Sequence, residues 1–287
     1  MLFAIGFVIV VGSVLGGYLP HGDIRVLWQP LELLIILGAA VGAFIIANPP
    51  SVQKAVLRNL KVLLRGAPYP RAAYLELLTL LYAVFRLAKG KGMLALEPHV
   101  ENPHESRLFE QFPHFMANPH AIEFLCDYLR LMTLGAEDPH QIEDLMRADM
   151  ETHHAETSQI AGALTTMSEG LPAFGIVAAV LGVIVTMGSL NEPPEILGRL
   201  IGAALTGTFL GVLLAYGVVG PMGQKLGAYF EAEAKYYGCM GAGLLGFMQG
   251  HPPAVAVEFA RKTLFSHERP SFDEVEQAVG GLPAVAG

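Results

Sequence analysis

Few side chains in the apolar parts of this 287-residue chain could carry chemistry. Glu32 is the only ionisable residue in one long apolar run, and Thr206 and Thr208 are hydroxyls in another. Ionisable groups are costly inside a membrane and usually serve function there, so Glu32 is a candidate for an ion pathway. A threonine hydroxyl can bond its own helix backbone or coordinate water and ions in a pore. The sequence leaves both alternatives open for Thr206 and Thr208.

Two prolines stand near the ends of apolar runs. Pro172 opens the run 170–190, and Pro221 closes the run 200–223. Proline suits the first turn of a helix and often marks a helix end, which favours a structural role for both. A kink at proline can also serve as a hinge for helix motion, which is the functional alternative.

Ten histidines raise the question of a metal site. The spacings from His99 through His104 and His114 to His120 do not give the i,i+4 pair by which a helix face holds a metal ion. The chain also lacks a phosphate-binding Gly-rich loop with Lys-Ser/Thr, a G-x-S-x-G nucleophile turn and a zincin helix. We therefore expect no metal, no cofactor and no enzymatic activity.

The composition indicates a membrane protein. Hydrophobic residues make up 53% of the chain, charged residues 15%, and the mean hydropathy is +0.46. The net charge is -8 and the 18 basic residues form no dense block, which argues against a general nucleic-acid binder.

Four apolar runs are long enough to span a membrane. They cover residues 1–18, 27–48, 170–190 and 200–223, and Glu32 is their only ionisable residue apart from tyrosines. A helix of 18 residues reaches about 27 Å, close to the thickness of the hydrocarbon layer. A cleaved signal peptide is the alternative for the first run, but no basic segment precedes it and no clear cleavage site follows. The sequence predicts four transmembrane helices in two pairs.

Basic residues indicate the orientation of these helices. The short connections 19–26 and 191–199 carry only Arg25 and Arg199, whereas 16 of the 18 basic residues fall in the segment 50–169 or after the fourth run. Basic residues near span ends favour the cytoplasmic side. We therefore expect both termini and the large middle segment in the cytoplasm.

The middle segment has helical periodicity and no convincing strand pattern. The expected fold is an all-α membrane protein with four transmembrane helices in two pairs, a helical cytoplasmic domain between spans 2 and 3, and a cytoplasmic tail. Lys225–Met248 could continue the fourth helix into the cytoplasm. The expected boundaries are 1–49 for helices 1 and 2, 50–169 for the cytoplasmic domain, 170–223 for helices 3 and 4, and 224–287 for the helix extension and tail.

Small residues are frequent in the apolar runs. The clearest patterns are Gly38-x-x-x-Gly42 and Gly207-x-x-x-Gly211. Such spacing lets helices approach closely in lipid, where packing drives their association. We expect tight helix contacts at both, within one subunit or between subunits.

Several motifs together give a resemblance that covers nearly the whole chain. The motifs are Gly16-Gly17-Tyr18, Gln29-Pro30-x-Glu32-Leu33, Glu101-Asn102-Pro103, Leu171-Pro172-Ala173-Phe174-Gly175-Ile176-Val177-Ala178-Ala179, Gly207-Thr208-Phe209-Leu210-Gly211, Leu214-Ala215-Tyr216-Gly217, Val257-Glu258-Phe259-x-Arg261-Lys262-Thr263-Leu264 and Glu268-Arg269-Pro270-Ser271-Phe272. With these motifs the sequence resembles the MotA family of flagellar stator subunits, within the MotA/TolQ/ExbB proton channel superfamily.

The resemblance implies partners and a location. Family members form a ring, expected to be a pentamer, around a dimer of MotB in the bacterial inner membrane. MotB carries the ion-binding aspartate, which accounts for the scarcity of carboxylates in the runs described above. The implied function is a proton-conducting stator subunit that drives motility and chemotaxis by exerting torque on the rotor protein FliG.

The resemblance also assigns roles to residues. It places the rotor interface at Glu97 and Lys89. The family usually has arginine at the position of Lys89, and Arg86 could share that role. It favours the hinge role for Pro172 and Pro221. Sodium-driven relatives have threonine at the position of Ala179, so this alanine points to protons, and Thr208 would be the remaining hydroxyl facing the pore.

Three alternatives remain at this stage. An ExbB/TolQ-like energiser of outer-membrane transport would have one span before the cytoplasmic domain, and this sequence predicts two. A solute transporter working alone would need broken helices and internal repeats, which the sequence lacks. A purely structural membrane scaffold is compatible with the glycine pattern alone.

Overall fold

A computed structural model describes residues 2–64, 69–135 and 138–283, and every regular element in these ranges is helical. The ends of the predicted first and last segments, and short parts of the predicted cytoplasmic domain, lie outside these ranges. The chain divides into two compact units. The first comprises Met1–Gly66 and Ala155–Phe230, and the second comprises Ala67–His154 and Glu231–Gly287.

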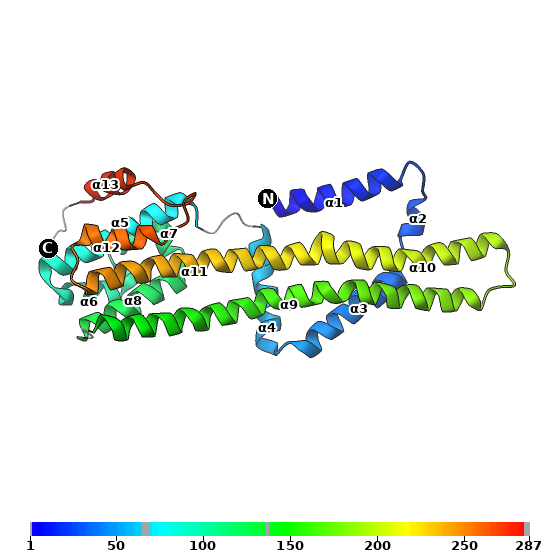
Figure 1. The fold of residues 1–287 in the computed structure, drawn as a ribbon, viewed down its shortest axis with the longest axis horizontal. Coiled ribbons are helices and arrows are strands. Elements are labelled where there is room, and N and C mark those ends of the chain that lie inside the picture. Colours follow the sequence, from blue (N-terminus) through cyan, green and yellow to red (C-terminus); the bar gives the residue numbers. More distant parts are fainter. Residues whose placement is uncertain (1, 65–68, 136–137, 284–287) are drawn as a thin grey trace. The chain divides into compact units, whose positions relative to one another are not determined.

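Two long helices, α9 (Pro139–Met187) and α11 (Gly220–Met248), contribute residues to both units (Figure 1). The other elements of the first unit are α1 (Leu2–Tyr18), α2 (Ile24–Leu27), α3 (Pro30–Ala47), α4 (Pro50–Asn59), the 3-10 helix η1 (Leu60–Leu64), α10 (Pro194–Leu214) and the π-helix η5 (Ala215–Val219). Those of the second unit are α5 (Arg71–Lys91), η2 (Met93–Leu96), α6 (Glu97–Glu101), η3 (Pro103–Glu105), η4 (Phe109–Gln111), α7 (Pro113–Met116), α8 (Pro119–Thr133), α12 (Pro253–Lys262) and α13 (Phe272–Gly280).

Three described helical segments are long and apolar enough to cross a membrane: Ile24–Ala47, Pro139–Met187 and Pro194–Met248. Helix α1 is also apolar but has 17 residues, which corresponds to about 26 Å. The predicted run 170–190 is the end of the much longer α9. The predicted run 200–223 passes from α10 through η5 into α11, and α11 continues to Met248.

The second apolar run begins differently from the prediction. Helix α3 starts at Pro30 and not at residue 27, because Trp28 and Gln29 are not helical. Gln29 has φ -119° and ψ 84°, in keeping with the exclusion of the α region before a proline. Pro30 then occupies the first turn of α3, where its missing N–H costs nothing.

In the first unit, α9 and α10 make backbone contact and α3 packs against them. The apolar cluster that joins them consists of Ile36 and Ala40 on α3, Leu171 and Ala178 on α9, and Ala215 in η5. Many other apolar side chains of this unit are exposed, among them Leu34, Ile46 and Ile184. Such surfaces suit lipid or further protein chains.

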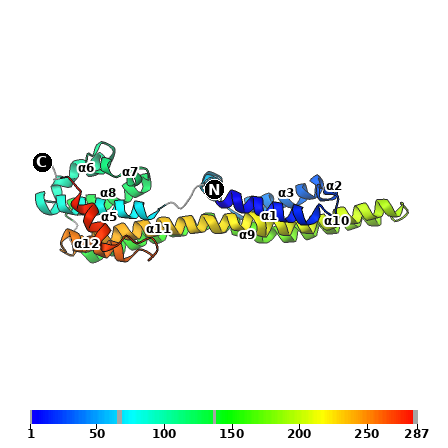
Figure 2. The same cartoon turned by 90° about the horizontal axis from the view of Figure 1, so that it is seen from above.

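In the second unit, α5 is the central helix. Its side chains Leu77, Leu80, Val84 and Phe85 are fully buried, and Figure 2 shows α6 and α7 on one side of it and α12 and α13 on the other. The core also takes in Tyr236 and Met240 from α11. This packing holds the end of α5 that carries Lys89.

Candidate functional site

The backbones of α9 and α10 touch at a set of glycines. A Cβ atom added to Gly175 would lie 2.9 Å from the carbonyl oxygen of Gly207, and one added to Gly211 would lie 2.8 Å from the Cα of Gly175. No side chain fits there, because real Cβ atoms do not come that close to backbone. The prediction of close packing is therefore confirmed for Gly207 and Gly211. Gly38 and Gly42 have no atom within 4 Å of a Cβ position among the described residues.

Glu32 reaches this glycine contact from the first turn of α3. Its Oε2 atom lies 3.2 Å from the position of a Cβ on Gly207. That oxygen is buried, and it has no hydrogen-bond partner among the residues that the structure describes. A buried polar atom without a partner is costly, which makes this carboxylate a candidate for a function beyond packing.

The two threonines differ in their surroundings. The hydroxyl of Thr206 is buried and donates to the carbonyl oxygens of Gly202, at 2.9 Å, and Val26, at 3.2 Å. Thr206 therefore bonds its own helix and also ties α10 to the end of α2. The hydroxyl of Thr208 is half-buried and makes no hydrogen bond within the described part of the chain. Thr208 is thus the hydroxyl left available for another group.

Ala179 lies in the same region of the first unit. Its backbone nitrogen is 3.2 Å from the position of a Cβ on Gly207, and its side chain is half-buried. The structure therefore brings Ala179 and Glu32 next to the same glycine, Gly207. That proximity could not be derived from spacing, because the two residues lie on different helices far apart in sequence.

Both prolines lie within helical stretches. Pro172 is inside α9, and Pro221 is the second residue of α11, directly after the π-helix η5. Pro172 does not mark a helix end, because α9 continues on both sides of it, whereas Pro221 lies in the first turn of α11. Proline removes one backbone hydrogen bond within a helix, and a π-turn departs from the regular α-helical bonding pattern. Two helix irregularities therefore stand in the first unit.

Ser168 is a residue that the sequence analysis did not single out. It is buried in α9 one turn before Pro172, and its hydroxyl donates to the carbonyl oxygen of Ala215 at 2.8 Å. A small polar residue one turn before an intrahelical proline was a signal that could have identified it, because proline leaves that residue's carbonyl without its helical donor.

Lys89 and Glu97 are exposed near one end of α5 in the second unit. Lys89 lies in the last turn of α5, and Glu97 opens α6. Between them Gly92 has φ +87°, a left-handed conformation that glycine adopts easily, and it redirects the chain. Neither residue forms an ion pair with another described residue. Both charges are therefore available to a partner.

Arg86 is placed differently from Lys89. Its side chain is half-buried, Nη2 donates to the carbonyl oxygen of Pro283 at 2.8 Å, and the guanidinium lies 5.9 Å from the centre of the Tyr82 ring. Helix α13 also joins the start of α5 through an ion pair of 2.5 Å between Arg71 and Glu274. Pro283, which follows α13, therefore holds Arg86 in place beside the exposed Lys89.

A buried polar contact supports the short helix that carries Glu97. His99 Nδ1 lies 2.8 Å from the hydroxyl oxygen of Ser106, which also accepts the backbone N–H of Phe109 at 3.2 Å. Burial lowers the pKa of His99, so the neutral imidazole is favoured in the folded protein. This contact fixes α6 against the turn that follows it.

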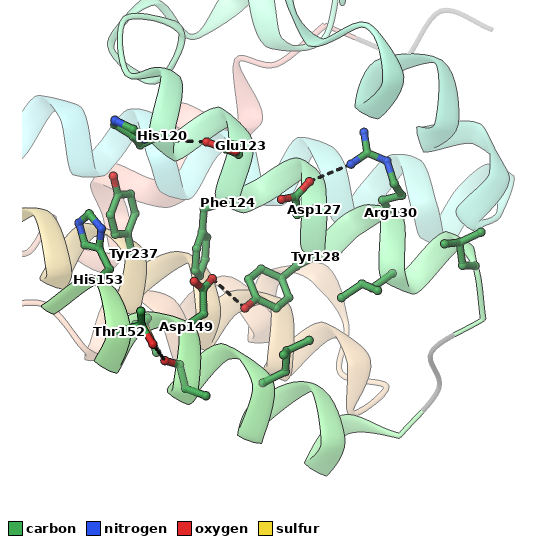
Figure 3. Close-up of a pocket in the computed structure, with 15 residues that line it drawn as sticks. His120, Glu123, Phe124, Asp127, Tyr128, Arg130, Asp149, Thr152, His153 and Tyr237 are labelled. Atoms are coloured by element: carbon green, nitrogen blue, oxygen red, sulfur yellow. Dashed lines mark hydrogen bonds and ion pairs between the residues drawn. The ribbon is translucent and has the colours of Figure 1, made fainter. Parts of the chain in front are cut away.

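The second unit also contains a groove of about 800 Å³ between α8 and the first turns of α9 (Figure 3). The hydroxyl of Tyr128 donates to Asp149 at 3.0 Å across it, and Arg130 pairs with Asp127 at 2.8 Å. Burial and the bond to Asp149 raise the pKa of Tyr128. Neither Lys89 nor Glu97 lines the groove. No group of His, Cys, Asp and Glu suited to a metal ion occurs among the described residues.

Comparisons with known proteins agree with this arrangement. Residues 4–92 match the family described as Motility protein A N-terminal, and residues 119–238 match the MotA/TolQ/ExbB proton channel family. Motility protein A of Escherichia coli (strain K12) is 43% identical over 280 residues, which cover 97% of this chain and 95% of that protein.

Two solved structures share the fold. The chain is similar to a subunit of C. jejuni MotAB, with a TM-score of 0.76 and 23% identity over 92% of this chain and 95% of that one. It is also similar to one in the flagellar MotAB stator complex from Bacillus subtilis, with a TM-score of 0.75 and 24% identity over 96% and 98%. The second family also includes TolQ and ExbB, whereas the N-terminal match and the 43% identical relative are both described as Motility protein A.

Proposed function

This chain belongs to the Motility protein A family and is a proton-conducting stator subunit of the bacterial flagellar motor, and we propose which of its residues line the channel and which contact the rotor. The proposal assigns a wall of the proton channel to α3, α9 and α10, and the contact with the rotor to the end of α5. One observation carries it. No ionisable residue occurs between Gly170 and Met187 or between Leu200 and Leu214, whereas Lys89 and Glu97 are exposed and unpaired among described residues.

The proposed membrane layout has four spans, with both termini in the cytoplasm. Three apolar helical segments are long enough to span a membrane, and the apolar α1, with 17 residues, is only slightly shorter than a span. The distribution of basic residues supports the orientation. In this layout residues 50–169 and 224–287 form the cytoplasmic part, and 1–49 and 170–223 form the two pairs of spans.

The proton carrier is proposed to be a carboxylate on MotB, the second component named in the solved MotAB complexes. The channel wall of this chain would then supply Thr208, Ala179 and Glu32 around Gly207. Thr206 would hold α10 against the end of α2 through its bond to the carbonyl of Val26. The family resemblance suggests five copies of this chain around two of MotB.

The rotor contact is proposed to use Lys89 and Glu97 against opposite charges on FliG. An exposed ion pair contributes little on its own, typically below about 1 kcal/mol, so it can form and break as the rotor passes. Arg86 would act beside Lys89 only if the end of the chain released its guanidinium. Bending of the helices at Pro172 and Pro221 is proposed to transmit the protonation change to the rotor contact.

Two experiments test the proposal. Deletion of the gene should abolish swimming, and complementation should restore it; a deletion strain that swims normally without a second stator set would contradict the motor function. Proton uptake into vesicles should require both this chain and MotB. Uptake with this chain alone would show that the carrier is not on the partner. Glu32→Gln should lower uptake by the pair without lowering the amount of assembled protein.

A further inference from the structure

One hydrogen bond joins the two helix irregularities of the first unit. Pro172 has no N–H, so the carbonyl of Ser168, four residues earlier in α9, lacks its usual helical donor. The hydroxyl of the same residue donates to the carbonyl oxygen of Ala215, 47 residues away, at 2.8 Å. Ser168 is 5% exposed, so water does not compete freely for this bond.

Ala215 is the first residue of the π-helix that precedes Pro221. The N–H of Gly220 donates to the carbonyl of Ala215, which is the i to i+5 bond of a π-turn. One carbonyl oxygen therefore accepts the π-turn's own bond and the hydroxyl from α9. Pro221 follows directly and cannot donate to the carbonyl of Gly217.

Gly220 completes the contact. A Cβ atom at this position would lie 3.0 Å from Oγ of Ser168 and 2.9 Å from the carbonyl oxygen of Ala215. The absence of a side chain at Gly220 thus lets the hydroxyl approach the π-turn. A change of bend at either proline would displace one partner of this bond.

We propose that Ser168 is a positioning residue that couples the two proline hinges, so that α9 at Pro172 and the helix at η5 and Pro221 bend together as the motor steps. The inference rests on the hinge role proposed above for Pro172 and Pro221. The coupling has a physical basis in burial, because a carbonyl and hydroxyl buried among apolar groups favour the state in which they are paired.

Two other hydroxyls of α9, those of Thr165 and Thr186, bond carbonyls of their own helix. The hydroxyl of Thr165 bonds the carbonyl of Ala161 in its own helix at 3.2 Å, and that of Thr186 bonds Gly182 at 2.8 Å. Both bonds stay within one turn of α9. Thr165 is exposed, so Thr165→Ala provides a matched loss of a hydroxyl one turn before Ser168.

The test compares Ser168→Ala, Ser168→Thr and Thr165→Ala in a gene-deletion strain. Two quantities are measured on single motors at high load: the number of assembled stator units, counted with a fluorescent tag, and the rise in rotation speed that each added unit gives. Ser168→Ala should leave the number unchanged and lower the rise by about twofold to fivefold, the population change expected for one lost hydrogen bond. Ser168→Thr, which keeps the hydroxyl, should restore the rise, and Thr165→Ala should not change it.

A normal rise in speed with Ser168→Ala would overturn the proposal, and so would a lower number of units with a normal rise, because that pattern belongs to a purely structural residue. If Ser168→Ala does not accumulate, Ser168→Cys replaces it, since a thiol of similar shape is a weaker donor. A full rise with Ser168→Cys would then overturn the coupling.

Pro172→Ala and Pro221→Ala separate this inference from the proposed function. If both leave the rise per unit unchanged, the hinge role itself fails. If both lower it while Ser168→Ala does not, the hinges act without this bond and only the coupling is wrong.

Discussion

Gly175 on α9 and Gly211 on α10 face each other so closely that a Cβ on Gly211 would lie 2.8 Å from the Cα of Gly175. The same added atom would also lie 2.8 Å from the carbonyl oxygen of Leu171, next to Pro172. The contact is therefore backbone against backbone, and it sits beside one of the two helix irregularities. Any side chain at Gly211 must push the helices apart where the channel wall is proposed to lie.

Gly211→Ala should destabilise the protein by about 1–3 kcal/mol, the usual cost of overpacking a close contact. Gly42→Ala is the matched control, because no described atom lies within 4 Å of a Cβ there. Thermal unfolding of the purified protein with MotB measures both. Equal midpoints for Gly211→Ala and the unsubstituted protein would show that the helices separate at little cost. A large loss for Gly42→Ala would place the Gly38-x-x-x-Gly42 contact between subunits.

Charge reversal at the end of α5 should impair torque without affecting assembly. Lys89→Glu and Glu97→Lys each change an exposed side chain, so unfolding free energies should stay within about 0.5 kcal/mol. Rotation speed of tethered cells should fall several-fold for each. Lys91→Glu, also exposed in the last turn of α5, is the control and should have a smaller effect. Lower amounts of membrane protein in the two variants would instead indicate a structural role.

Swimming speed should follow the proton-motive force and should not respond to sodium at constant ionic strength. The physical reason is the apolar methyl group of Ala179, which offers no oxygen to replace water around a sodium ion. The measurement is speed against sodium concentration, with a protonophore as the control that removes the driving force. A speed that rises with sodium would show that the inference from Ala179 is wrong.

Acidification should loosen α6 through His99. Burial lowers the pKa of this imidazole, so the unfolded state binds the proton at a higher pH than the folded one. The contribution of the neutral His99 side chain to folding stability is therefore complete above the ordinary histidine pKa of about 6.5. It is lost as the pH falls from there through the lowered pKa of the folded protein.

Hydrogen exchange of the amides in residues 97–105 at pH 7.5 and 5.5 measures this effect. Exchange, corrected for its intrinsic pH dependence, should accelerate at pH 5.5 in the unsubstituted protein and change less in His99→Gln. His104→Gln is the control, because His104 is exposed and is not part of the contact with Ser106. The same acceleration in His99→Gln would assign the effect to another group.

Local sequence accounts for the helices but less well for their ends. The apolar run before Pro49 corresponds to α3, and the helical periodicity of the middle segment agrees with helices such as α5, because the spacing of apolar residues shows which helical face is buried. The start of α3 was misplaced because Pro30 excludes helix at Gln29. The continuation of α9 and of α10–α11 through Pro172 and Pro221 depends on packing, which compensates for a missing backbone bond.

The sequence by itself determined the membrane character, the helical class and the family, because hydropathy, periodicity and motifs are properties of residues along the chain. It also named Glu32, Gly207 and both prolines. Only the tertiary structure decided that Glu32 contacts Gly207, that the Thr206 hydroxyl donates to the carbonyl of Val26, and that the Ser168 hydroxyl donates to the carbonyl of Ala215. These are contacts between helices distant in sequence, and their geometry follows from the packing of whole helix faces, which no local pattern encodes.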